Sequence, residues 1–137
     1  MPVRIKPPWS SGLIFQELLA QPWFLNVYER LRRFMSYDRN WNGYGEEAIS
    51  QRAVVRTLVV LYRVALGGPE PVVVPMSHGG IQVEWYYSGT EIEIDVPPSG
   101  PYSLLIVHPD GKFDEKVVDD LEDPIWVRLN PVILGLQ

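Results

Sequence analysis

Residues 81–96 read IQVEWYYSGTEIEIDV, and this stretch decides the fold. Its first half alternates apolar residues, from Ile81 to Trp85, with more polar neighbours, and its second half alternates acidic residues with isoleucine and valine. A period of two is typical of a strand that buries only one face. Ser88 and Gly89 lie between the two halves, so the stretch predicts a β-hairpin closed by a tight turn.

Neighbouring segments extend this pattern toward a larger antiparallel sheet. Short apolar or alternating runs bounded by turn residues predict further strands at 72–74, 102–108, 113–118 and 124–129. The tail that begins at Pro131 is apolar, and the sequence leaves open whether it packs in the core or forms an interface.

The first half of the chain has a different period, with apolar residues recurring every three or four positions. This spacing predicts helices at 13–20, 23–37 and 53–66. Ser50 is the expected N-cap of the third helix, and the two glycines that follow the helix end it. The valines in 53–66 leave a strand as an alternative, but the length of the run favours a helix.

The chain has 137 residues and a mass of 15.7 kDa, which corresponds to one domain, residues 1–137. Residues 1–9 contain three prolines and predict an extended arm, 10–66 form a helical part and 71–137 form a sheet part. The predicted fold is therefore α+β, with two to three N-terminal helices packed on an antiparallel sheet of four to five strands.

The composition excludes several classes of protein. The absence of cysteine excludes disulfides, a thiol nucleophile, cysteine-ligated zinc and iron–sulfur clusters, and it suits a reducing cytoplasm. No apolar run approaches the roughly 18 residues of a membrane span, and residues 1–8 lack the apolar region of a signal peptide. We therefore expect a cytoplasmic protein without a membrane partner.

Charge is divided unevenly along the chain. Residues 1–63 carry nine Lys or Arg against five Asp or Glu, whereas residues 64–137 carry three against twelve. The planar guanidinium of arginine suits phosphates, so arginines on the predicted helices are candidate phosphate-binding residues of a nucleoprotein subunit. They are Arg32, Arg33, Arg52, Arg56 and Arg63. A solvated helix face, or internal pairing with the acidic half, is the competing interpretation, which the sequence slightly favours.

The sequence lacks a recognisable catalytic arrangement. His78 and His108 are the only histidines, neither lies in a known catalytic motif, and no cofactor or metal is predicted. We therefore expect a protein that is not an enzyme. A metal-dependent hydrolase that uses Glu84, Glu93 and Asp95 remains as a third alternative.

One predicted strand face is strongly acidic. Glu91, Glu93 and Asp95 alternate on it at a spacing of about 6.6 Å, and Glu84 and Tyr86 of the neighbouring strand extend it in a simple hairpin register. Such a row can bind a cation or an arginine-rich partner. A solvated face that discourages aggregation is the interpretation that the sequence favours.

The segment 38–47 reads DRNWNGYGEE and is the sharpest local pattern. Its first six positions match a calcium-binding loop, but Ile49 stands where that loop requires a bidentate glutamate, so a simple turn is favoured. Trp41 and Tyr44 bring large aromatic side chains beside glycines. They either fill the interface between helices and sheet, which is favoured, or contact a partner.

Two motifs in order, NWNGYGEEAIS at 40–50 and GGIQVEW at 79–85, resemble those of small bacterial proteins with an N-W-D-G-Y-G-A motif before a G-G-x-x-x-E-W hairpin. The likeness covers about residues 39–96. This chain has Asn42 and Glu46 where that pattern has aspartate and alanine. The family has no established activity and its members are accessory-like, so the resemblance implies a partner rather than a reaction.

We therefore expect a bacterial accessory protein that binds another protein, as an antitoxin, an immunity protein or a small subunit of a larger complex does. The candidate partner-binding residues are Trp41, Tyr44, Glu84 and Tyr86. The nucleoprotein subunit and the hydrolase are the alternatives.

Overall fold

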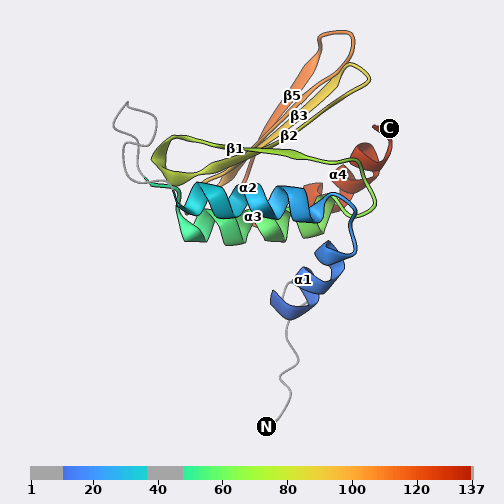
Figure 1. The fold of residues 1–137 in the computed structure, drawn as a ribbon. Coiled ribbons are helices and arrows are strands. Elements are labelled where there is room, and N and C mark those ends of the chain that lie inside the picture. The colour runs from blue at the N-terminus through green and yellow to red at the C-terminus, as the bar shows by residue number, and fades with distance from the viewer. Residues whose placement is uncertain (1–10, 37–47, 137) are drawn as a thin grey trace.

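A computed structural model of the chain describes residues 11–36 and 48–136. They form an α+β fold in which helices lie on one side of a five-stranded antiparallel sheet, which confirms the predicted class (Figure 1). The helices are α1 (Ser11–Leu19), α2 (Phe24–Met35), α3 (Gln51–Val64) and α4 (Ile125–Leu134). The strands are β1 (Val72–Pro75), β2 (Ile81–Tyr87), β3 (Thr90–Val96), β4 (Tyr102–Val107) and β5 (Phe113–Val118).

The strands lie in the sheet in chain order, so each strand pairs with its neighbours in sequence. β2 and β3 form the predicted hairpin, with Tyr87 opposite Thr90 across a two-residue turn. Ser88 and Gly89 both have positive φ, at 53° and 79°. This is the conformation of a type I′ turn, whose twist matches that of the flanking strands.

The helices predicted at 13–20, 23–37 and 53–66 are present as α1, α2 and α3, with slightly shifted ends. Ser50 caps α3 as expected, because its hydroxyl accepts a hydrogen bond from the backbone N–H of Arg52 at 3.1 Å. The strand alternative for 53–66 is therefore wrong. None of the helices in the described ranges has the length and hydropathy of a membrane-spanning segment.

The strand predicted at 124–129 is also wrong, because this segment begins α4. The buried residues of α4 are Trp126, Leu129 and Ile133. Their spacing of three and four positions places them on one helical face, which packs in the core. In the tail that begins at Pro131, Ile133 and Leu136 are buried, whereas Val132 and Leu134 are exposed. The carboxylate of Asp123 accepts a hydrogen bond from the N–H of Ile125 at 2.9 Å and supports the start of the helix.

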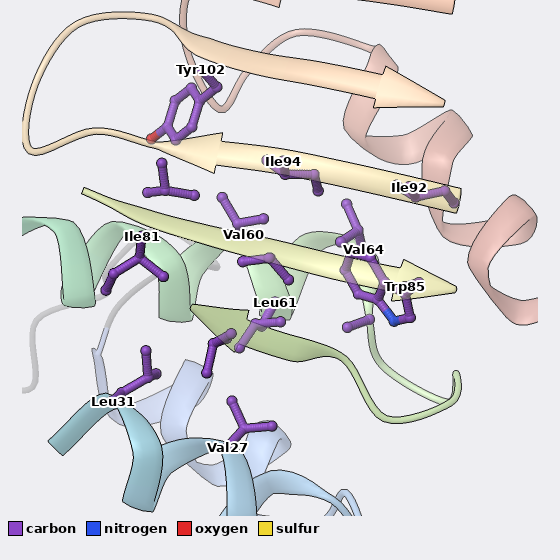
Figure 2. Close-up of a cluster of buried hydrophobic side chains, with 14 of the residues drawn as sticks. Val27, Leu31, Val60, Leu61, Val64, Ile81, Trp85, Ile92, Ile94 and Tyr102 are labelled. Carbon is purple, nitrogen blue, oxygen red and sulfur yellow. The ribbon is translucent and has the colours of Figure 1, made fainter. Parts of the chain in front are cut away.

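The core lies between the helices and one face of the sheet (Figure 2). α2 contacts β1, and α3 contacts β2 and β3. Trp85 and Trp126 are fully buried, and their indole N–H groups donate to the carbonyls of Pro69 at 3.2 Å and Asp120 at 2.8 Å. These bonds satisfy the polar atom of each side chain and tie the core to two loops.

Candidate functional site

Alternation along the strands divides the side chains of the sheet between two faces. Ile81, Val83 and Trp85 of β2 point toward the helices and are fully buried. The intervening side chains point to the other face, which no helix of the described residues covers (Figure 1). We call this second face the open face.

The open face is acidic. Its carboxylates belong to Glu84, Glu91, Glu93, Asp95 and Glu115. Within the described ranges, no strand position on this face holds a lysine or an arginine. Glu84 lies directly opposite Glu93 across the β2–β3 pair, and like charges in this position are destabilising. A cationic partner would relieve this repulsion.

Glu93 lies in the middle of this cluster. Partial burial raises the pKa of the Glu93 carboxyl, and the negative charges of Glu91, Glu84 and Asp95 raise it further. Asp95 has a neutral partner, because the side-chain amide of Gln82 donates to its carboxylate at 2.7 Å. The folded protein therefore holds Glu93 in surroundings that oppose its ionised form.

Glu93→Gln is expected to stabilise the protein at neutral pH. Below the pKa of glutamate in the unfolded chain, both states hold the proton, and the variant and the wild type are expected to be equally stable. As the pH rises toward the higher pKa of the folded protein, the unfolded state releases its proton first, and the wild type loses stability. Urea unfolding at acidic and neutral pH measures the difference.

Glu122→Gln is the control for this experiment, because it removes one negative charge from a loop outside the open face. The control is expected to change the unfolding midpoint less than Glu93→Gln does. A Glu93→Gln variant that is equally stabilised at both pH values would contradict the assignment.

Apolar side chains lie among these carboxylates. Tyr86, Phe113 and Val117 are 72%, 62% and 65% exposed. Tyr86 and Phe113 belong to one row across the sheet, with Glu91 and Val107 between them. Aromatic side chains are enriched at protein interfaces because they supply a large contact area at a small cost in conformational entropy.

A hollow of about 280 Å³ lies in the open face between β3, β4 and β5. Glu93, Asp95 and Glu115 line it, and Leu105 and Val117 also border it. Lys116 contributes to the lining too, but its Nζ lies 3.6 Å from the carboxylate of Asp123. A lysine or arginine side chain suits such a site, because its alkyl stem packs on apolar surface while its charged head meets carboxylates.

The turn before β2 joins this face to the segment before α3. The N–H of Ser50 donates to the carbonyl of Gly79 at 2.9 Å, so the ends of the two sequence motifs meet here. Gly79 has a φ of 79°, and a Cβ at this position would lie 2.9 Å from the carbonyl oxygen of Ala48, so glycine is required. A second hollow, lined by His78, shares Asp95 with the first.

Among the predicted partner-binding residues, Glu84 and Tyr86 lie together on the open face. The segment 38–47, whose first six positions match a calcium-binding loop, lies outside the described residues. It includes Trp41 and Tyr44. Sequence reasoning did not single out the residues that β5 adds to this face, Phe113, Glu115 and Val117. Their alternation is the signal that could have found them, but the consecutive charges of the DEK run obscure it.

Arg56 makes intramolecular contacts at one end of the sheet. Its guanidinium donates to the carbonyls of Pro97 and Gly100, and its Nε donates to the hydroxyl of Tyr102 at 3.0 Å. Its Cζ also lies 4.2 Å from the centre of the Tyr102 ring. Arg56 therefore links α3 to the loop between β3 and β4.

Four further arginines belong to the nucleoprotein alternative, and three carboxylates belong to the hydrolase alternative. Arg32 lies 3.8 Å from Glu29, Arg33 and Arg52 are exposed, and Arg63 is half-buried. The hydrolase alternative relies on carboxylates that share the open face. Within the described ranges, no group of three or more histidine, aspartate or glutamate side chains is placed to hold a metal ion.

The geometry of the open face is thus the observation that bears on function. Comparisons with family models, with curated proteins and with solved structures find no match to this chain.

Proposed function

We propose that this protein acts by binding another protein through the open face of its sheet, without catalysing a reaction itself. One observation supports the proposal above the others: exposed aromatic and aliphatic side chains on that face stand among carboxylates that no strand lysine or arginine of the face neutralises. An accessory role fits such a surface, as in an antitoxin, an immunity protein or a small subunit of a larger complex.

The two kinds of side chain have different tasks in this proposal. Tyr86 and Phe113 supply apolar contact area, which contributes most of the affinity of an interface. The carboxylates favour a cationic partner and raise the rate at which it associates. We therefore expect the complex to survive high salt while it forms more slowly there.

A variant with Tyr86→Ser and Phe113→Ser is expected to lose most of its bound partner. Truncation of an aromatic anchor costs about 2 kcal/mol at an interface, which corresponds to a loss of affinity of about 30-fold for each anchor. Affinity purification of the tagged full chain from its native cells, at low and high salt, measures the protein and nucleic acid that remain bound.

The matched control carries Leu25→Ser and Val55→Ser, which change residues of α2 and α3 that are 68% and 55% exposed. This control is expected to retain the partner. Equal retention by the two variants would show that the open face is not the binding surface. Recovery of nucleic acid that is lost steeply with salt would instead favour the arginines of the helices.

A further inference from the structure

β5 is an edge strand that can accept a neighbour. In the described part of the chain it pairs with β4 and with no other strand, in a continuous register from Phe113 to Val118. The opposite edge, β1, has four residues and ends in Pro75, whose nitrogen has no hydrogen to donate. Of the two edges, β5 therefore offers the longer uninterrupted backbone.

The backbone groups of three β5 residues point away from β4. The N–H of His108 donates to the carbonyl of Lys112 at 2.8 Å, which makes these two residues a hydrogen-bonded pair of the antiparallel ladder. Bonded and non-bonded pairs alternate along such a ladder. The even-numbered residues of β5 therefore bond to β4, whereas Phe113, Glu115 and Val117 direct their N–H and C=O groups outward.

The same three residues place their side chains on the open face. A strand added along β5 would therefore bond to their backbone and put its own alternate side chains on that face. Its residue opposite Glu115 would lie beside the hollow that Glu93 and Asp95 also line. Its residues opposite Phe113 and Val117 would meet exposed apolar side chains.

A second copy of β5 would add a carboxylate to the open face. Antiparallel pairing that places Phe113 opposite Val117 of the other copy would also place the two Glu115 carboxylates directly opposite each other on the open face, and Asp114 opposite Lys116 on the other face. Like charges in this position are destabilising, whereas a lysine or arginine opposite Glu115 is stabilising. Asp114 and Lys116 already contact His108 at 2.9 Å and Asp123 at 3.6 Å within the chain. The carboxylates of the open face therefore favour a different, basic strand.

We infer that the partner binds as an extended segment added along β5, with the pattern apolar, any residue, Lys or Arg, any residue, apolar, and with the basic residue opposite Glu115. This inference rests on the proposed function and names the mode of binding and the chemistry of the partner. The pattern is the same in both strand directions, so it does not depend on whether the added strand is parallel or antiparallel.

Two synthetic peptides of seven residues test the inference. Both have valine at positions 2 and 6 and threonine elsewhere, with either lysine or glutamate at position 4. In a titration of the full chain followed by amide NMR signals, the lysine peptide is expected to bind about tenfold more tightly. The signals of Glu115 and Val117 are expected to move, and their amides to exchange more slowly. Equal affinities, or shifts confined to other elements, would overturn the inference.

Three variants sharpen the test. Glu115→Lys is expected to reverse the preference between the two peptides. Val117→Pro removes one outward N–H without removing a bond to β4, and it is expected to weaken the lysine peptide at least about tenfold. Val117→Thr keeps this N–H and is the matched control, with an expected change within about twofold. Circular dichroism checks that each variant folds. If Val117→Pro does not fold, the result for Glu115→Lys decides the test.

Capture of the natural partner separates this inference from the proposed function. If the Tyr86→Ser and Phe113→Ser variant loses the partner while Val117→Pro keeps it, the partner binds the open face but does not add a strand along β5. The inference is then wrong, and the proposed function is supported. If neither variant loses the partner, both proposals are wrong. A dimer of the chain that Val117→Pro abolishes would identify a second copy as the occupant and would overturn the inference.

Discussion

Trp85→Ala is expected to lower the free energy of unfolding by about 3–5 kcal/mol. The indole is fully buried in the cluster that Val64 of α3 and Ile92 of β3 share (Figure 2). Its removal leaves a cavity and deprives the carbonyl of Pro69 of its donor. Because a domain of this kind is stable by only about 5–15 kcal/mol, the variant is expected to lie close to its unfolding transition. Thermal and urea unfolding followed by circular dichroism measure the loss.

Tyr86→Ala is the matched control, because Tyr86 is the next residue on the same strand and faces the open side. Its expected effect on stability lies within about 0.5 kcal/mol, since it touches no part of the core. It is expected instead to weaken capture of the partner. Similar losses of stability for the two variants would contradict the register of β2, because a slip of one residue exchanges the two faces.

Arg56→Met is expected to lower the free energy of unfolding by about 2 kcal/mol. Methionine keeps much of the aliphatic stem, but it removes the donors that bind the carbonyls of Pro97 and Gly100 and the hydroxyl of Tyr102. In the variant, water is expected to replace part of these hydrogen bonds, because this end of the sheet is not fully buried. Urea unfolding measures the change.

Arg52→Met provides the comparison, because Arg52 is an exposed arginine one turn earlier on α3. Its expected effect on stability is within about 0.5 kcal/mol. Two arginines that bind phosphates would behave differently: both substitutions would weaken nucleic-acid binding and reduce its salt dependence, with little change in stability. That outcome would favour nucleic-acid binding by the arginine-bearing helices over protein binding by the open face.

Short-range patterns are enough to predict much of the fold. The alternation in 81–96 alone assigns six side chains to one face, those of Gln82, Glu84, Tyr86, Glu91, Glu93 and Asp95. Side chains two positions apart in a strand share a face by local geometry alone, so a register error is the main way to misplace them. The capping of α3 by Ser50 is equally local.

The end of the chain shows where such patterns are insufficient. The segment 124–129 is short and apolar, and a strand or a helix both accommodate it. Contacts distant in sequence decide between them: α4 packs on α3, and the side chain of Asn130 donates to the carbonyl of Val64 at 2.8 Å. These contacts join residues about half the chain apart. The spacing of apolar residues along the sequence carries no information about such distant contacts.

The sequence by itself determined the class of fold, the order of most elements and the acidic character of one strand face. Only the tertiary structure decided that Glu115 of β5 joins Glu93 and Asp95 around one hollow, and that Arg56 uses its donors inside the molecule. The physical reason is the range of the interactions involved. Backbone geometry sets the direction of a side chain from its nearest neighbours, whereas strand order and loop closure bring distant charges together.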